Sequence, residues 1–201
     1  MKSGFVGAGR VAGSLGGLLH AAGHTILFAH RDGVTPSFGL PRTLEQLAAE
    51  ADCIVLALPF LAAQEVLPGL ISLLAGKLVV DATNPVQADW SPLLLGEQNS
   101  AGETVAKLLP SSRVVKAFNT IFADVMRADR INRAGSRVSC FIASDDAAAA
   151  DTVAELADSA GFASCIVGPL KAARYLEAMA HLNIQIAIGM GKGTNAAFLY
   201  H

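Results

Sequence analysis

The chain has 201 residues, of which 52% are hydrophobic and 16% are charged, and its formal net charge is −2 at pH 7. This composition favours a globular fold with a large core and excludes an extensively disordered chain. No run of basic residues marks a nucleic-acid-binding face. The longest apolar stretch, residues 54–63, contains Pro59 and is shorter than the about 20 residues that span a bilayer. We therefore expect neither a nucleic-acid partner nor a membrane association.

The cysteines are few and scattered. Cys53, Cys140 and Cys165 each lie in an apolar run, which predicts buried free thiols rather than disulfides or a metal cluster. The histidines show no ligand spacing apart from one pair separated by a probable helix stop, so no metal is expected. Arg10 and several glycines interrupt the apolar N-terminal segment that a secretory leader would need. These features predict a cytoplasmic protein.

Short β-branched apolar runs alternate with helical stretches along the chain, a pattern typical of α/β proteins with a parallel sheet. Seven strands are expected, at residues 3–6, 25–29, 53–58, 78–81, 114–118, 140–143 and 165–167.

The intervening segments carry helix signals. Apolar residues at helical spacing predict helices within residues 11–22 and 149–160. Thr43 and Gln46 form a capping-box pattern ahead of a further helix. Residues 84–110 break the periodicity before a short helix near 103–109, and a crossover this long often covers a site. Helix formers also dominate residues 170–188. The whole pattern predicts a doubly wound fold.

A glycine-rich turn follows the first expected strand. Gly7-Ala8-Gly9-Arg10-Val11-Ala12 fits the pattern G-x-G-x-x-A at the start of a helix. In this fingerprint Gly7 makes the tight turn, Gly9 lets a pyrophosphate approach the backbone, and Ala12 allows the helix to pack closely on the sheet. The helix N-terminus would attract the phosphates. The alternative is a glycine turn that serves packing alone.

The second expected strand ends at His30-Arg31-Asp32, about 20 residues after the glycine turn, where such folds distinguish NAD from NADP. Arg31 is placed to bind a 2′-phosphate through its planar fork, and His30 is placed to flank the adenine or to donate to that phosphate. Arg10 would add a second cation. Asp32 would repel the phosphate if it turned inward, so NADP is favoured and NAD stays open.

Two later strands carry a family resemblance. The runs Val79-Val80-Asp81-Ala82-Thr83-Asn84-Pro85 and Val114-Val115-Lys116-Ala117-Phe118-Asn119-Thr120 resemble those of the NADPH-dependent reductases of the deazaflavin coenzyme F420. Residues 103–110, the acidic run at 144–146 and Gly168-Pro169-Leu170 are similar as well, so the resemblance covers essentially the whole chain. It implies a Rossmann-type, mostly parallel sheet in residues 1–168. Residues 169–201 would form a small C-terminal helical segment that lines the acceptor cleft or a dimer contact.

The resemblance also implies a set of cofactor-binding residues and a homodimer that holds NADP(H) beside an F420-like or flavin acceptor. The family usually has a hydroxyl residue beside the 2′-phosphate arginine, where this chain has His30. The residues implied are Gly7, Gly9, Arg10, Val11 and Ala12 for the pyrophosphate, His30 and Arg31 for the 2′-phosphate, Leu58 and Pro59 on the adenosine side, and Asn84, Ala117 and Asn119 near the nicotinamide. No catalytic side chain is assigned.

Several polar residues have two interpretations. Lys116, in an apolar strand, is either an amine with a depressed pKa or a packed stem whose head reaches water or a helix carboxylate. Asn119 and Thr120 are placed to cap a helix over the apolar residues that follow. This role is compatible with a contact between Asn119 and the nicotinamide, because the cap lies at the carboxyl end of the strand. His181 and Asn183 belong either to an acceptor pocket or to a core or dimer contact. Trp90 is expected near the edge of a cleft.

The leading hypothesis is an NADP(H)-dependent oxidoreductase that transfers hydride between nicotinamide and a deazaflavin or flavin-like acceptor. Hydride transfer between stacked rings depends on positioning and on exclusion of water, so it requires no catalytic triad. A ferric or flavin reductase and a non-catalytic NADP(H)-binding sensor are the alternatives. Dehydrogenases with the same glycine turn carry larger helical substrate domains than the residues after Gly168 provide.

Overall fold

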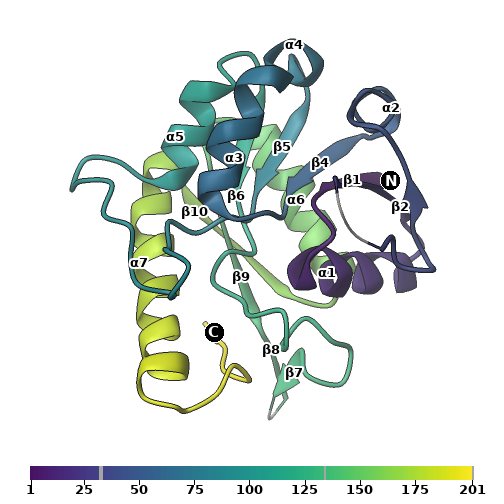
Figure 1. Ribbon diagram of the computed structural model, residues 1–201. Coiled ribbons are helices and arrows are strands. Elements are labelled where there is room, and N and C mark those ends of the chain that lie inside the picture. The colour runs from purple at the N-terminus through teal and green to yellow at the C-terminus, as the bar shows by residue number, and fades with distance from the viewer. Residues whose placement is uncertain (32–33, 134, 201) are drawn as a thin grey trace.

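A computed structural model describes residues 1–31, 34–133 and 135–200. Figure 1 shows a central twisted sheet with helices on both sides. Its eight strands are β1 (Lys2–Val6), β2 (Thr25–Ala29), β3 (Leu40–Pro41), β4 (Cys53–Leu56), β5 (Leu78–Asp81), β6 (Arg113–Lys116), β9 (Ser139–Ser144) and β10 (Ala163–Gly168). The order across the sheet is β10-β9-β6-β5-β4-β1-β2-β3. Read from the β3 edge, strands β1 to β6 have the order 3-2-1-4-5-6, which is the strand order of the Rossmann fold. The predicted fold class is confirmed.

The sheet is parallel apart from one pair. Strand β9 runs antiparallel to β6, with Val115 opposite Ser144, whereas the other neighbours are parallel. Two short strands, β7 (Asn132–Arg133) and β8 (Ser136–Arg137), pair outside this sheet. Because β1, β2, β4, β5 and β6 are parallel, their carboxyl ends lie at one edge of the sheet, and ligands bind at this edge in such folds.

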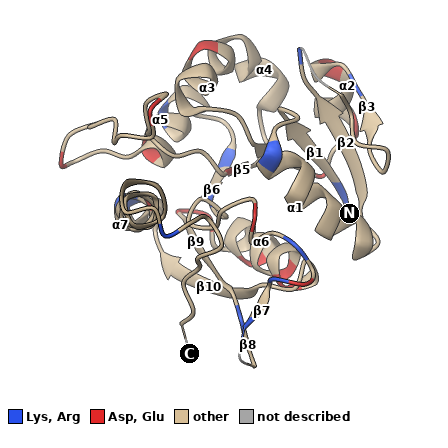
Figure 2. Cartoon of the chain, turned by 60° about the horizontal axis from the view of Figure 1, so that its bottom comes forward, with Lys and Arg blue, Asp and Glu red and all other residues tan. Residues whose placement is uncertain are grey.

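Helices cover both faces of the sheet (Figures 1 and 2). Helices α1 (Arg10–Ala21) and α6 (Ala147–Ser159) pack on one face. The other face carries α2 (Leu44–Glu50), α3 (Phe60–Val66), the 3₁₀ turn η1 (Leu67–Leu70), α4 (Ile71–Leu74) and α5 (Ala101–Leu108). Successive residues of β4 contribute to the cores on opposite faces of the sheet. Val55 lies in the core on the side of α1 and α6, and Ile54 and Leu56 lie in the core on the side of α2 to α5. A sheet buried on both faces needs such continuous apolar strands.

The C-terminal part returns to the sheet. After β10 come the 3₁₀ turn η2 (Leu170–Ala172), α7 (Ala173–Ile184) and the π-helix η3 (Gln185–Gly189). Residues 190–200 then run back beside β9, where Ser139 N donates to Phe198 O at 3.0 Å. Tyr200 N donates to Ser139 Oγ at 2.8 Å. The division of the chain at residues 168 and 169 stays a prediction.

Most expected elements are confirmed, and the differences have physical reasons. The predicted capping box is present, since Thr43 Oγ1 accepts from Gln46 N and Gln46 Oε1 accepts from Thr43 N. Strands β3, β7 and β8 were not expected, because two residues carry no periodicity. The helix expected after Thr120 is wrong: within the described chain, residues 119–131 form successive turns. The apolar residues at 121–126 nevertheless enter the main core from those turns.

Candidate functional site

The glycine turn joins β1 to α1 at the carboxyl edge of the sheet. Gly7 has a φ of +108°, and its N–H donates to Ala29 O at 2.8 Å. A Cβ at this position would lie 2.6 Å from the carbonyl oxygen of Ala57, so only glycine fits. Ala12 is completely buried against the sheet. The tight turn and the close helix packing expected from the sequence are both confirmed.

Gly9 differs from Gly7, because nothing in the described protein requires a glycine there. Its φ is −76°, and a Cβ would meet no described atom within 4 Å. Gly9 is also the N-cap of α1, and in the described chain no side chain accepts a hydrogen bond from this N-cap position. The first turn of α1, which the structure describes in full, contains no acidic residue. Free N–H groups at the positive end of a helix dipole, beside open space, suit a phosphate anion. The residues of this turn therefore fit a dinucleotide pyrophosphate.

The end of β2 holds the residues expected at the 2′-phosphate. His30 is half-buried, and its Nε2 lies 2.9 Å from Thr35 Oγ1. Its Nδ1 is buried and has no partner among the described residues. Arg31 is exposed, and Asp32 lies outside the described residues. The choice between NADP and NAD therefore stays a prediction.

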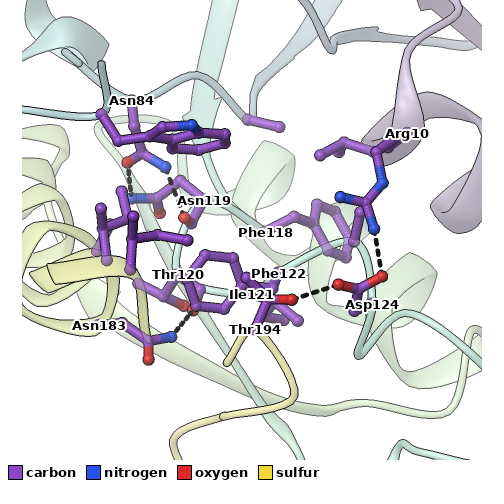
Figure 3. Close-up of a pocket in the computed structure, with 17 residues that line it drawn as sticks. Arg10, Asn84, Phe118, Asn119, Thr120, Ile121, Phe122, Asp124, Asn183 and Thr194 are labelled. Carbon is purple, nitrogen blue, oxygen red and sulfur yellow. Dashed lines mark hydrogen bonds and ion pairs between the residues drawn. The ribbon is translucent and has the colours of Figure 1, made fainter. Parts of the chain in front are cut away.

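A cavity of about 390 Å³ opens from the start of α1 toward α7 (Figure 3). Four predicted residues line it: Arg10, Val11, Asn84 and Asn119. The other eight do not: Gly7, Gly9, Ala12, His30, Arg31, Leu58, Pro59 and Ala117. Ala117 is fully buried in the core, so its side chain is not available to a ligand. Trp90, which is 51% exposed, lines the cavity as expected for a residue at a cleft edge.

Apart from Ala82, the remaining lining residues come from two segments that are distant in sequence. Residues 118–124 follow β6 and form one wall, whereas Ala180, Asn183 and Ile184 of α7 form another, together with Ile188 and Thr194. The walls are mostly apolar, which suits a flat ring system.

Asn84 and Asn119, which both line the cavity, hydrogen-bond to each other (Figure 3). Asn84 Nδ2 donates to Asn119 O at 2.7 Å, and Asn119 Nδ2 donates to Asn84 Oδ1 at 2.9 Å and to Leu176 O at 3.2 Å. These contacts fix the orientation of the Asn119 amide. Its Oδ1 is buried and has no partner among the described residues. A buried acceptor beside a cavity is suited to an N–H or O–H group of a ligand.

Phe118 adopts a backbone conformation that is rare for a bulky residue. Its φ is 62° although its side chain is buried, packed edge-on against Phe162 at 6.0 Å. Such left-handed residues occur where the surrounding structure over-determines the chain, frequently at functional sites. The turn at Phe118 directs residues 119–124 along the cavity. Neither Asn119 nor Thr120 caps a helix, so that interpretation is wrong.

Lys116 lies in a buried cluster behind the cavity. Its Nζ is 2.9 Å from Asp81 Oδ2, 2.9 Å from Glu177 Oε1 and 2.7 Å from Thr83 O. Burial acts to lower the pKa of Lys116, but the carboxylates of Asp81 and Glu177 outweigh it and hold the pKa above its ordinary value. The interpretation as an amine with a depressed pKa is therefore wrong. The head reaches a helix carboxylate, as the second interpretation expected.

The two candidate polar residues of α7 have separate environments. Asn183 lines the cavity, and its Nδ2 donates weakly to Thr120 O at 3.4 Å. His181 instead faces a second hollow of about 320 Å³, and its Nε2 lies 3.0 Å from Pro85 O. Only Asn183 of this pair is placed to touch a ligand in the main cavity.

Asp124 and Thr194 were not identified from the sequence. Asp124 forms an ion pair with Arg10, and the Thr194 hydroxyl donates to the same carboxylate (Figure 3). The Thr194 hydroxyl, and then Arg10, lower the pKa of Asp124 below its ordinary value. No local pattern indicates this cluster, because its members come from α1, the loop after β6 and the C-terminal segment.

An open sheet in this strand order, with the glycine fingerprint and a cavity at the carboxyl ends of its strands, places the protein in the class of Rossmann-type α/β proteins. Residues 2–85 match the model of a family described as NADP oxidoreductase, coenzyme F420-dependent. The N-terminal part of the chain is therefore similar to this family of NADP oxidoreductases.

Individual relatives extend this similarity beyond residue 85. A candidate F420-dependent NADP reductase from Arthrobacter sp. FB24 has a TM-score of 0.86 and 27% identity, and the match covers 100% of this chain and 99% of that one. A hypothetical protein from Sinorhizobium meliloti has a TM-score of 0.75 and 30% identity, over 85% and 86% of the two chains. Metalloreductase STEAP3 of Rattus norvegicus is 33% identical over 183 residues, which are 89% of this chain. The chain spans 36% of that relative's length.

No helix in the described part of the chain is long and apolar enough to cross a membrane. Among the described residues, no group of three or more histidine, cysteine or acidic side chains is arranged to hold a metal ion. Cys53 and Cys140 are buried free thiols, as expected, and Cys165 is half-buried.

Proposed function

We propose that the protein transfers hydride between NADP(H) and a flavin-like or deazaflavin acceptor. The observation that carries the proposal is the continuity of the site. The start of α1 borders, through Arg10 and Val11, a cavity lined by Asn119, whose Oδ1 has no partner among the described residues. The N-terminus of a helix suits the pyrophosphate of a dinucleotide, and an apolar pocket suits its nicotinamide ring. The two parts of the site are adjacent, as are these two groups in the nicotinamide half of NADP(H).

The residues of this chain would bind and orient the two reactants. NADPH supplies the hydride when it is bound. The N–H groups of α1 would hold its pyrophosphate, Asn119 would orient its nicotinamide end, and Arg31 would hold its 2′-phosphate. Trp90, Phe122 and Ile184 would exclude water from the cavity, which leaves positioning as the main source of rate enhancement.

The first experiment is a calorimetric titration with NADPH and NADH in parallel. We expect preferential binding of NADPH, and we expect Arg31→Ala to abolish the preference while Arg137→Ala, at an exposed arginine paired with Asp158, leaves it intact. Equal or stronger binding of NADH would contradict the assignment of Arg31. Binding of neither nucleotide would contradict the proposed function.

Gly9→Ala tests whether the turn binds a phosphate or serves packing alone. We expect it to abolish NADPH binding while the thermal unfolding midpoint stays close to that of the wild type, because the added Cβ meets no described atom. Gly13→Ala is the matched control, since its Cβ also meets no described atom and it lies within α1. Unchanged NADPH affinity in Gly9→Ala would contradict a pyrophosphate bound at this turn.

The acceptor is tested by NADPH oxidation with F420, with free flavins and with a ferric chelate with or without flavin. The similarity to metalloreductase STEAP3 supports ferric reduction as a second candidate function. Hydride delivers two electrons and ferric iron takes one, so this activity requires an added flavin as the relay. NADPH binding without oxidation by any acceptor would support a sensor.

We also propose that the protein forms a homodimer. Three large side chains of α7 and β10 are prominently exposed, namely Tyr175 at 74%, Leu182 at 54% and Ile166 at 46%. Exposed apolar surface of this kind is typical of contact regions. Sedimentation velocity should give twice the monomer mass, and Leu182→Glu should shift the protein toward the monomer.

A further inference from the structure

Arg10 has two possible anionic partners at the same site. Its side chain is 74% exposed at the first residue of α1, beside the uncapped N–H groups that would hold a pyrophosphate. In the structure its guanidinium pairs instead with the carboxylate of Asp124, from the loop after β6 (Figure 3). Both residues line the cavity.

The Asp124 carboxylate is held more firmly than the guanidinium of Arg10. The Thr194 hydroxyl donates to it, and Arg130 Nη1 donates to the Asp124 carbonyl oxygen at 3.2 Å. The carboxylate is 30% exposed, against 74% for the Arg10 side chain. Aspartate is charged at neutral pH at its ordinary pKa, and the further lowering of the Asp124 pKa by the Thr194 hydroxyl and by Arg10 reflects stabilisation of that charge. When an anion approaches α1, Arg10 is therefore the partner that moves.

We propose that Asp124 is an internal counter-anion for Arg10 that a bound dinucleotide must displace before Arg10 contacts its pyrophosphate. This inference rests on the proposed function. In this proposal Asp124 lowers the affinity of the protein for the dinucleotide. The ion pair orders Arg10 in the free protein, and the Asp124 carboxylate competes with the pyrophosphate for the Arg10 guanidinium. Thr194 is a positioning residue, because it holds the competing carboxylate in place.

The test compares NADPH affinity in wild type, Asp124→Asn, Arg10→Gln and the double variant. Asparagine keeps an acceptor for Thr194 and removes the charge. We expect Asp124→Asn to tighten NADPH binding about 2- to 5-fold, the range that a partly exposed ion pair represents. Arg10→Gln should weaken binding, and Asp124→Asn should give no further tightening in the Arg10→Gln background. That non-additivity is specific to competition for Arg10.

Asp129→Asn is the matched control. It removes the same charge from an exposed carboxylate that pairs with Arg127 and does not line the cavity. Equal tightening by Asp129→Asn would show a general charge effect and overturn the inference. Unchanged or weaker NADPH binding by Asp124→Asn would overturn it as well.

Inorganic pyrophosphate separates failure of the inference from failure of the proposed function. We expect pyrophosphate to raise the unfolding midpoint of Asp124→Asn more than that of the wild type, and to lose this advantage when Arg10 is glutamine. If pyrophosphate raises the unfolding midpoint of Asp124→Asn more than that of the wild type but no dinucleotide binds, the proposed function is wrong and the counter-anion inference stands. If neither pyrophosphate nor NADPH distinguishes the variants, the inference is wrong.

Discussion

Lys116 Nζ and Glu177 Oε1 lie 2.9 Å apart, and their contact joins the end of β6 to α7. The Glu177 carboxylate also accepts from Ala101 N at 2.8 Å and from Gly102 N at 3.0 Å, at the start of α5. The same ammonium contacts Asp81 at the end of β5. Four elements are thus fixed around one buried charge cluster. Because α7 forms a wall of the cavity, this cluster sets the position of that wall relative to the sheet.

Removal of the ammonium should destabilise the fold strongly. In Lys116→Met two buried carboxylates lose their shared partner, and we expect the free energy of unfolding in urea at pH 7.5 to fall by about 3–5 kcal/mol. Adding Asp81→Asn and Glu177→Gln should recover part of the loss, because the buried charges are then removed. Lys107→Met, at an exposed lysine of α5, should change stability little. A similar loss in both lysine variants would argue against the cluster.

His24 should make stability depend on pH. Burial lowers the pKa of His24 below its value of 6.5, and its Nε2 lies 3.0 Å from Ser159 Oγ. Between the lowered pKa and 6.5 the unfolded chain binds a proton that the folded chain does not. Stability contributed by His24 is therefore present above pH 6.5 and is lost as pH falls below it. Urea titrations between pH 7.5 and 5.5 should show this decline in the wild type.

The matched comparison uses glutamine at two histidines. His24→Gln should flatten the decline in unfolding free energy below pH 6.5, since glutamine does not titrate. His20→Gln replaces an exposed histidine of the same helix region and should leave the slope as in the wild type. An unchanged slope in His24→Gln would contradict the assignment.

The three cysteines should differ in reactivity. Burial raises the pKa of the Cys53 thiol and of the Cys140 thiol to about 12 each, so almost no thiolate forms at pH 8. Cys165 is half-buried on β10. We expect iodoacetamide at pH 8 to modify Cys165 alone in the folded protein and all three in urea, as measured by peptide mass spectrometry. Folded Cys165→Ser should take up no label, and rapid labelling of Cys53 would contradict the buried environment.

The parts of the fold that the sequence predicts are those with local signals. The glycine turn, the capping box at Thr43 and the buried strands have periodic or motif patterns that a single segment contains. The turns after Phe118 have apolar spacing like that of a helix, and the tertiary environment selects turns there because Phe118 is held in a left-handed conformation. Local spacing does not distinguish the two outcomes.

The site is predictable only in part for the same reason. Asn84 and Asn119 follow strands whose ends meet at the sheet edge, so the topology brings them together. Asp124 and Thr194 are separated by 70 positions and meet only because the C-terminal segment folds back. The pairing of Arg10 with Asp124 is therefore visible only in the tertiary structure. The sequence alone indicates that Arg10 is a cation close to the expected phosphate.

A last prediction concerns Asn119 Oδ1, which has no hydrogen-bond partner in the described part of the chain. If this oxygen accepts a hydrogen bond from the nicotinamide end of the ligand, Asn119→Ala should weaken NADPH binding about 3- to 10-fold, the value of one ordinary hydrogen bond. The variant also removes the donor to Leu176 O, so unfolding free energy should fall by about 1–2 kcal/mol. Adenosine 2′,5′-bisphosphate lacks the nicotinamide half and separates these effects. Its affinity should stay unchanged in Asn119→Ala, and a parallel loss for both ligands would mean that Asn119 supports the fold without contacting the nicotinamide end.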